Sequence, residues 1–391
     1  MRIFYVTNAR LPTEKAHGLA TVKLCEALAK KGVEVTIFAP RRINPLRQDI
    51  YEYYRAERNF KIIFLPSLDL IWLGFGQRFF FLLQLFSFSL VSAFWLFSRY
   101  YLMEHLRDVA IFSHDHIPLF FTSFFAPRIF YDIHHYPEHT IFYKRVLRNA
   151  FGIGVQTKWK IEALFRDFGA AQDKIVYWPN GTDVERFDLP FSVQEARVKL
   201  GLPMDRKIAL YTGSLQSWKG VETLVAAAEF LPADIVVYIV GGEQREIEVL
   251  KTLNPKPETL NPIFVGQRPW AEIPLWLKAA DVLVLPNTGR EKVSRFYTSP
   301  MKLFEYMASG CPIVASGIPS VREIVDETMV FFAAPDDPCS FARAIQGALN
   351  NPSEAVRRAE RVRQEARKYT WDARAEKILS LINLSKVEPS L

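Results

Sequence analysis

The first forty residues alternate between short apolar runs and one helical pattern. Ile3–Val6 is an apolar run, and a polar loop follows it. Apolar residues then recur every three positions from Leu19 to Leu28, which is typical of the buried face of a helix. Val33–Ala39 is a second predicted strand, which ends at Pro40. A strand, a helix and a strand in this order predict a parallel β-sheet.

The same alternation continues along the chain and restarts once. Pro190 interrupts it, and a second set of strands begins at Ile208. We therefore predict an α/β fold with two Rossmann-like, doubly wound domains at residues 1–188 and 189–370, followed by a segment at 371–391. Ligands bind such sheets at the carboxyl ends of the strands, so a site in a cleft between the domains is expected. The further predicted strands are Val109–Ser113, Arg128–Ile133, Gly152–Gln156, Lys174–Trp178, Ile208–Thr212, Ile235–Val240, Pro262–Val265, Val282–Pro286, Pro312–Ala315 and Val330–Phe332.

Phenylalanine is concentrated in one part of the chain. Eighteen of the 31 Phe residues lie between Phe60 and Phe151, and the stretch Phe79–Ser98 carries no charge. Its length matches a membrane-spanning helix of about 20 residues. The strands on either side of it belong to one predicted sheet, which argues against a crossing. A core-packed helix and a helix lying on a membrane surface stay open, and Arg78 and Arg99 at its ends favour the surface helix over a spanning one.

The net charge of +7 is uneven, because residues 1–190 account for +6 of it. A solvated face explains this excess, and so does attraction to anionic lipid headgroups. Nucleic acid is not expected as a partner, since no recognised binding motif accompanies the charge. Cys25, Cys311 and Cys339 form no Cys-x-x-Cys pair, which fits a reducing cytosol and gives no support for a disulfide framework or a zinc ribbon.

The segment Tyr297–Gly310 carries the most informative chemistry. Ser299 suits the N-cap of a helix, and Pro300 suits its first turn. The free N–H groups at such a helix start form an anion site that suits a diphosphate. Glu305, about one and a half turns further, is placed to accept hydrogen bonds from two vicinal hydroxyls, such as those of a ribose. An ordinary capped helix with a surface glutamate explains the same residues.

This segment resembles the signature of glycosyltransferase family 4, the retaining, nucleotide-sugar-using group with the two-domain GT-B fold. The resemblance covers most of 1–40 and 150–391 and is weakest from 41 to 110. In this family a final helix often crosses back to the N-terminal domain, which implies that role for 371–391. The other matching segments are Trp178–Asp183 with Phe187, Leu210–Ser214 with Lys219–Glu222, Val240–Gly242, Ala280–Val282 with Pro286, and Tyr369–Trp371.

The resemblance implies roles for individual residues. Glu305 would contact the donor ribose, Lys219 would bind the diphosphate, and His134 would be the histidine of the catalytic cleft. The backbone at His17–Gly18 would approach donor or acceptor. Other donor-binding positions would be Gly213, Ser214, Tyr297, Thr298, Ser299, Pro300 and Met301, and the acceptor side would include His114, His116 and His135.

Two departures from the family pattern affect the donor site. Tyr297 stands where the signature usually has its first glutamate, and Ser214 stands where a second basic residue often occurs. Lys219 would then bind the diphosphate alone or with help from Arg290, Lys292 or Arg295.

We therefore expect a retaining, metal-independent glycosyltransferase without a cofactor. Its acceptor would be a glycan or a lipid-linked glycan of the cell envelope, and the protein would be cytoplasmic, peripheral at the inner face of an anionic membrane. A sugar-nucleotide epimerase shares the architecture, and a non-catalytic sugar-nucleotide or membrane-surface binding protein would fit Tyr297. A metal-dependent hydrolase would use the histidines between 105 and 139, although no Asp-x-Asp motif or HExxH spacing is present.

Overall fold

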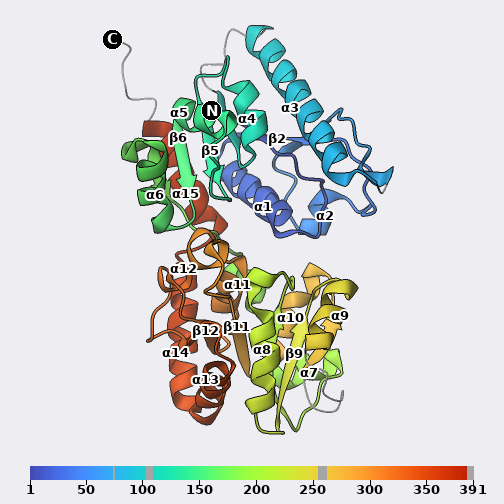
Figure 1. Ribbon diagram of the computed structural model, residues 1–391, viewed down its shortest axis with the longest axis vertical. Helices are drawn as coiled ribbons and strands as arrows, with labels where there is room; N and C mark the ends of the chain where they lie inside the picture. Colours follow the sequence, from blue (N-terminus) through green and yellow to red (C-terminus); the bar gives the residue numbers. More distant parts are fainter. Residues whose placement is uncertain (74, 103–108, 254–261, 385–391) are drawn as a thin grey trace. The chain divides into compact units, whose positions relative to one another are not determined.

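The computed structural model describes residues 1–73, 75–102, 109–253 and 262–384 (Figure 1). The chain forms two compact units, and each is described by itself. The N-terminal unit comprises Met1–Pro179 together with the segment from Trp371 onward, and the C-terminal unit comprises Asn180–Thr370.

The N-terminal unit is built on a seven-stranded sheet in which every pair of neighbouring strands is parallel. The strand order is β3-β2-β1-β4-β5-β6-β7, so the chain starts in the middle and winds outward in both directions, as a doubly wound fold does. The strands are β1 (Arg2–Val6), β2 (Glu34–Pro40), β3 (Lys61–Leu65), β4 (Val109–Ser113), β5 (Ile129–Ile133), β6 (Gly152–Val155) and β7 (Ile175–Tyr177).

Successive residues of these strands alternate between two helical layers. Tyr131 and Ile133 of β5 pack in the apolar cluster that includes Phe88 and Leu164. Phe130, between them, faces the opposite side, where Gly152 leaves room for Leu381. Fully buried parallel strands are therefore apolar on both faces, as the sequence pattern indicates. The helices are α1 (Ala16–Lys30), α2 (Ile50–Tyr54), α3 (Gln77–Leu102), α4 (His116–Thr122), α5 (Ile141–Asn149), α6 (Lys158–Phe168) and α15 (Trp371–Leu384).

The C-terminal unit repeats this plan with a parallel six-stranded sheet in the order β10-β9-β8-β11-β12-β13. The strands are β8 (Lys207–Thr212), β9 (Ile235–Val240), β10 (Ile263–Gly266), β11 (Val282–Leu285), β12 (Ile313–Ser316) and β13 (Phe331–Ala333). The helices are α7 (Val193–Leu200), α8 (Val221–Ala227), α9 (Gln244–Leu253), α10 (Ile273–Ala279), α11 (Met301–Ser309), α12 (Pro319–Arg322), α13 (Pro338–Asn350) and α14 (Pro352–Ala366). The prediction of two Rossmann-like α/β sheets is confirmed.

The chain passes between the units at Pro179–Asn180 and again at Thr370–Trp371. The sequence predicts the boundary at 188/189, just before Pro190. In the structure Thr182 already belongs to the C-terminal unit, because its backbone N–H donates to the Tyr369 carbonyl over 2.8 Å. After Thr370, α15 packs on α1 of the N-terminal unit, where Lys31 Nζ lies 2.6 Å from the Glu376 carboxylate.

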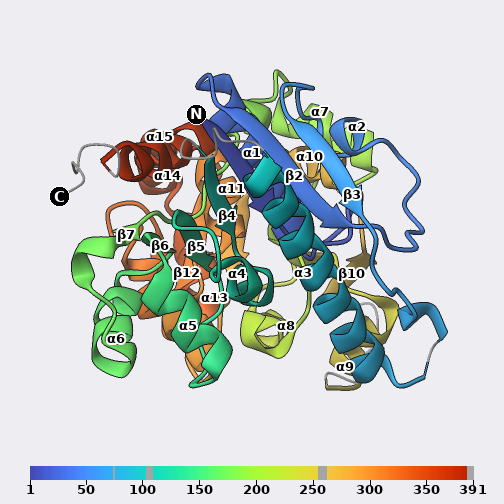
Figure 2. The same ribbon diagram turned by 90° about the horizontal axis from the view of Figure 1, so that it is seen from above.

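The Phe-rich segment forms α3, which packs against α4 and β3 of the N-terminal unit and lies along its surface (Figures 1 and 2). Among the described residues, this is one helix whose length and composition would allow it to cross a membrane. Its inward face is partly polar, since Gln84, Ser89 and Ser92 are fully buried. Its outward face is apolar, with Phe79 at 66% and Phe94 at 72% exposure. The core-packed interpretation therefore holds for one face of the helix only.

A buried ion pair fixes α15 to the sheet. The Asp132 carboxylate, at the end of β5, accepts hydrogen bonds from Arg374 over 2.6 Å and from the Trp178 indole over 3.0 Å. The Gln156 amide donates to it over 2.8 Å and His134 Nε2 over 3.0 Å. Burial alone would raise the pKa of Asp132, but the Arg374 and His134 charges hold that pKa far below its usual range.

Replacing Arg374 with Met tests this ion pair. The change leaves the Asp132 charge buried without its cation, which costs about 3–5 kcal/mol of unfolding free energy. Urea denaturation of the variant measures this loss, and Arg367→Met, at an exposed position of the C-terminal unit, serves as control. A loss below about 1 kcal/mol in the Arg374 variant would show that α15 does not depend on the pair.

Candidate functional site

The carboxyl ends of β1, β4 and β5 bring three histidines together in the N-terminal unit. The His114 and His134 rings stack with centroids 4.9 Å apart, and the His17 ring lies 6.3 Å from His114. The Tyr5 hydroxyl lies 2.9 Å from His114 Nδ1. His17, His114 and His134 therefore form one group at the end of the sheet where ligands of this fold bind.

Burial controls the charge of this group. It lowers the pKa of His17 and of His134 to about 4, although the Asp132 carboxylate opposes the shift at His134. Both rings are consequently neutral near pH 7. Since the Asp132 carboxylate can only accept, a neutral His134 donates from Nε2, and its Nδ1 is a hydrogen-bond acceptor.

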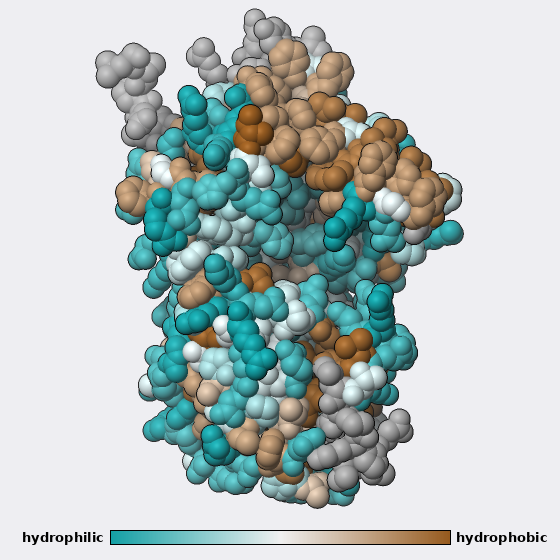
Figure 3. Space-filling view, in the orientation of Figure 1, coloured by the Kyte–Doolittle hydropathy of each residue, from teal (hydrophilic) through white to brown (hydrophobic). Residues whose placement is uncertain are grey.

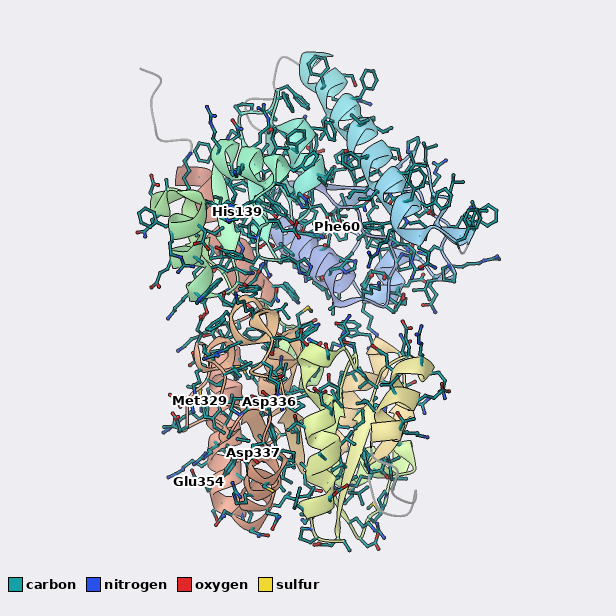
Figure 4. The ribbon with its side chains drawn as sticks, viewed as in Figure 1. Phe60, His139, Met329, Asp336, Asp337 and Glu354 are labelled. Carbon is teal, nitrogen blue, oxygen red and sulfur yellow. The ribbon has the colours of Figure 1, made fainter. Side chains whose placement is uncertain are left out.

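The other predicted residues of this unit make different contacts. The His116 ring stacks on Tyr143 at 3.8 Å between centroids, and His135 is exposed. Gly18 is buried where a Cβ atom would meet the Tyr54 hydroxyl at 2.4 Å, so packing within the protein already requires a glycine there. His139 stacks on Phe168 in another part of the unit (Figure 4).

Sequence reasoning missed Asn8, Asp115 and Gln84 beside the histidine group. The Asn8 backbone N–H donates to the Asp115 carboxylate over 2.7 Å, and the Gln84 amide donates to the Asn8 side chain over 2.9 Å. Asn8 lies two residues after the end of β1, and a polar residue so close behind a buried strand is a signal in the sequence. Across the described ranges, no group of three or more His, Cys, Asp or Glu residues is arranged to hold a metal ion.

In the C-terminal unit, the end of β8 turns sharply at Gly213. Gly213 has φ +130°, and a Cβ atom there would meet the Lys302 side chain at 1.8 Å. Its carbonyl lies against Gly241, where a Cβ atom would meet that oxygen at 2.2 Å. Two glycines are therefore needed for the ends of β8 and β9 to approach each other and for Lys302 to pass beneath the turn.

Helix α11 starts one residue later than the sequence suggested. Pro300 is its N-cap, and its first residue is Met301. The prediction of Ser299 as N-cap is wrong, because the Ser299 hydroxyl accepts from the Asn180 backbone N–H over 3.2 Å instead. The Leu303 N–H donates to the Pro300 carbonyl over 3.0 Å, while the N–H groups of Met301 and Lys302 have no backbone partner within the helix, as is usual at a helix start.

Glu305 of α11 is surrounded by compensating charge. Burial raises the pKa of Glu305, while Arg186 and Lys302 oppose that shift. Arg186 lies in the 3₁₀ turn η4 (Val184–Phe187), and its guanidinium stacks over the Trp270 ring at 2.7 Å from the centroid. The interpretation of Glu305 as an ordinary surface glutamate does not fit this buried setting.

Two partly buried lysines lie close enough for their charges to interact. Lys302 Nζ donates to the Tyr211 hydroxyl over 2.8 Å, and burial lowers the pKa of Lys302 to about 7, against the opposing Glu305 charge. Lys219 ends the 3₁₀ turn η5 (Ser217–Lys219), with its Nζ 3.4 Å from the Trp218 ring centroid. Burial lowers the pKa of Lys219 well below its usual value, and the Lys302 charge lowers it further.

The loop residues expected to assist Lys219 are placed differently. Lys292 and Arg295 are exposed, and the Arg290 side chain is 76% exposed, 3.8 Å from the Asp336 carboxylate. Tyr297 ends the π-helical turn η9 (Val293–Tyr297), and the Thr298 hydroxyl donates to the Val293 carbonyl over 2.8 Å. Lys302, which sequence reasoning did not assign, is the basic residue that lies directly under Gly213.

The arrangement in the C-terminal unit is suited to an anion. Two partly buried ammonium groups lie close together, Glu305 is the carboxylate near Lys302, and the N-terminus of α11 lies next to Lys302 in the chain. A bound diphosphate would restore the protonation that burial disfavours, because opposite charge raises the pKa of a lysine. The site can therefore hold a diphosphate without an additional cation.

Two family descriptions match the chain. "Glycosyltransferase Family 4" matches residues 19–186, and "Glycosyl transferases group 1" matches residues 206–351. The two ranges together cover more than half of the chain and extend over both units. The parallel sheets and the two matching families thus place the chain among glycosyltransferases of the GT-B class. More narrowly, the chain belongs to glycosyltransferase family 4.

Similar proteins place the chain within this class. A D-inositol 3-phosphate glycosyltransferase of Xylanimonas cellulosilytica is 27% identical over 251 residues, which are 61% of this chain and 58% of that protein. The alignment with this relative therefore spans less than two thirds of its length. A sucrose-phosphate synthase from Thermosynechococcus elongatus superposes with a TM-score of 0.76 at 22% identity, covering 98% of this chain and 99% of that chain. Anabaena HepE in complex with UDP and glucose gives 0.74 at 18% identity, with coverage of 98% and 99%.

The variant Lys302→Met tests whether this lysine binds the diphosphate. We expect the affinity for UDP or GDP, whichever the protein binds, to fall at least about tenfold, the equivalent of one charge-assisted hydrogen bond. Calorimetric titration at pH 8 should also show less proton uptake than in the wild type, because Lys302, with a pKa of about 7, is largely neutral before binding.

A second variant separates charge from packing. Adding Ser214→Arg to Lys302→Met returns a cation to the neighbouring turn, and we expect part of the lost affinity to return. Nucleoside affinity, measured in parallel, should not change. Equal diphosphate affinity of the wild type and Lys302→Met would contradict the assignment.

Proposed function

We propose that the chain is a retaining glycosyltransferase that moves a sugar from a nucleotide-sugar donor to a membrane-associated acceptor. The observation that carries this proposal is the pair of partly buried lysines Lys219 and Lys302, with Glu305 near Lys302, at the end of a Rossmann-like sheet. The family to which the chain belongs supports the same reaction class.

The proposed chemistry follows from these charges. Lys219, Lys302 and the first N–H groups of α11 stabilise the diphosphate as it leaves with the bond electrons, which is the largest catalytic contribution in such sites. Glu305 accepts hydrogen bonds from the ribose hydroxyls. The acceptor oxygen attacks on the face from which the diphosphate departs, so the configuration of the sugar is retained. No metal ion takes part in this proposal.

On the acceptor side, the proposal assigns the neutral histidine group to hydroxyl recognition. His134 donates to Asp132 through Nε2, which fixes its ring and leaves Nδ1 as acceptor for a sugar hydroxyl proton. His17 belongs to the same group. Neutral rings can orient hydroxyls across the physiological pH range, because their pKa values of about 4 lie well below it.

A donor panel tests this function. UDP-glucose is the first donor to try, because HepE has been solved with it, and GDP- and ADP-sugars complete the panel. A bound donor should raise the thermal midpoint by mass action, and Glu305→Ala should abolish most of that shift. Product analysis with and without acceptor then distinguishes transfer from epimerisation, which needs no acceptor. Failure of every nucleotide-sugar to stabilise the wild type would overturn the proposal.

We place the acceptor at a membrane because of the outward face of α3. Phe79, Leu82, Leu90, Phe94 and Phe97 follow one another at helical spacing and are 40–72% exposed. The space-filling view shows this apolar surface over α3 (Figure 3). A surface helix of a globular protein normally turns its polar side outward.

The positive charge near α3 supports the proposal that a lipid bilayer contacts its outward face. Arg78 and Arg99 at the two ends of α3 are exposed, and residues 1–190 carry nearly all of the net positive charge. Apolar side chains flanked by arginines suit the boundary between acyl chains and anionic headgroups. We therefore propose a cytoplasmic protein that is peripheral at the inner face of the membrane, where a lipid-linked envelope glycan would be its acceptor.

Vesicle partitioning tests the membrane proposal. Binding to phosphatidylglycerol vesicles should fall more than about tenfold in the variant Phe79→Ser/Leu82→Ser/Phe94→Ser, because each side chain contributes on the order of 1.5 kcal/mol or more when buried. The control is Val198→Ser/Met204→Ser/Val356→Ser, whose three residues are 53–71% exposed on the C-terminal unit. Equal partitioning of the two variants would show that α3 does not contact the bilayer.

A further inference from the structure

A small pocket in the N-terminal unit is lined by three arginines and lies apart from the residues assigned above. Its walls are Arg10, Arg41 and Arg42, and its apolar lining is Leu11, Pro40 and Phe64. Arg10 follows β1, Arg41 and Arg42 follow β2, and Phe64 lies near the end of β3. The pocket is therefore at the carboxyl end of the sheet, which is the ligand-binding end of this fold.

Hydrogen bonds between neighbouring loops hold the pocket in shape. The Arg41 backbone N–H donates to the Leu65 carbonyl over 2.7 Å, and the Asn44 amide donates to the Pro12 carbonyl over 2.8 Å. The Ile43 backbone N–H donates to the Asp69 carboxylate over 2.9 Å. The loops after β1, β2 and β3 are thus tied together, so the arginines are presented on a fixed backbone.

The arginine charges are only partly compensated. Arg10 pairs with Glu14 at 2.8 Å. Arg42 Nε lies 3.7 Å from the Asp69 carboxylate and is buried without a hydrogen-bond partner. Within the part of the chain that the structure describes, Arg41 makes no ion pair with a carboxylate. Three guanidinium groups therefore face one pocket with two carboxylates between them.

The proximity of Arg10 and Arg42 is itself unfavourable in the empty pocket. Burial lowers the pKa of Arg42, and the Arg10 charge lowers it further against the opposing effect of Asp69. An anion that bridges the guanidinium groups would relieve this repulsion. Guanidinium groups bind phosphate oxygens in paired, planar geometry, which makes phosphate the best match.

The surroundings of the pocket are apolar and exposed. Ile43 is 63% exposed and follows Arg42 directly. On the segment that joins β3 to α3, Leu68, Trp72 and Phe75 are 56–66% exposed, and the Leu68 backbone N–H donates to Ser87 of α3 over 3.0 Å. An apolar surface thus extends from the rim of the pocket to the outward face of α3.

We propose that the Arg10–Arg41–Arg42 pocket binds the phosphate or diphosphate group of an amphiphilic acceptor whose apolar chain lies along the β3–α3 segment. This inference rests on the proposed function and specifies its acceptor as a lipid phosphate. A free phosphate ligand would use the same guanidinium groups but would gain nothing from the apolar rim.

Binding of farnesyl diphosphate in uncharged detergent micelles tests the pocket. We expect the wild type to bind it at least about tenfold more tightly than farnesol or inorganic pyrophosphate. The variant Arg10→Gln/Arg41→Gln should lose at least about tenfold of that affinity, since two charge-assisted contacts are removed. Arg42 is left unchanged because it neutralises Asp69. The control variant Arg148→Gln/Arg361→Gln removes the same charge at exposed positions and should bind as the wild type does.

Two further measurements separate the possible sources of the phosphate. Partitioning of the Arg10→Gln/Arg41→Gln variant to phosphatidylglycerol vesicles should stay within about twofold of the control, and nucleoside diphosphate affinity should not change. Unchanged farnesyl diphosphate affinity in this variant would overturn the inference, and so would equal affinity of the wild type for farnesyl diphosphate and farnesol. A selective loss of vesicle binding would likewise overturn it, because the pocket would then bind headgroups. Intact donor binding in any of these cases would leave the proposed function standing.

Discussion

The buried Asp132 carboxylate is the interaction on which the N-terminal unit depends. Arg374, Trp178, Gln156 and His134 all donate to it, so it joins β5 to the helix at the end of the chain, to the segment before the unit boundary and to the histidine group. A carboxylate in such surroundings stays ionised only because a guanidinium compensates it. The same contact that fixes α15 therefore also fixes the ring orientation of His134.

The C-terminal unit shows the opposite balance of charge. Lys219 and Lys302 are partly buried and Glu305 is the carboxylate near Lys302; among the described residues, neither lysine has an ion pair like that of Asp132 with Arg374. In a structural ion pair, protein groups compensate each other's charge. In a ligand site, the ligand supplies the compensating charge. The Asp132 charge therefore supports the fold, whereas we interpret the Lys219 and Lys302 charges as the binding site for an anion.

The fold was accessible from the sequence because buried parallel strands leave continuous apolar runs. The strand β3 was not predicted, since Lys61–Leu65 is short and lies in the part where the resemblance is weakest. Glu305 and Lys219 were recognised from motifs, whereas Lys302 was overlooked although it lies in the same segment. Lys302 lies under Gly213 because α11 contacts β8, where Lys302 donates to the Tyr211 hydroxyl. No local sequence pattern predicts this contact.

Similar limits apply to the other residues that sequence reasoning missed. Arg374 meets Asp132 across 242 positions of the chain, and Gln84 meets Asn8 across 76. Ser299 was assigned as N-cap because its residue type suits that position, but its hydroxyl takes part in a contact with Asn180 instead. Residue propensity identifies candidates for a local role such as an N-cap. Tertiary contacts determine which of these residues takes that role.

Titration with a nucleoside, its monophosphate and its diphosphate, in the uracil and guanine series and in the presence of a chelator, tests the central claim most directly. Lys219 and Lys302 predict that affinity in one series rises at least about tenfold from nucleoside to diphosphate without any metal ion. Equal affinity for nucleoside and diphosphate in both series would contradict the account of this site.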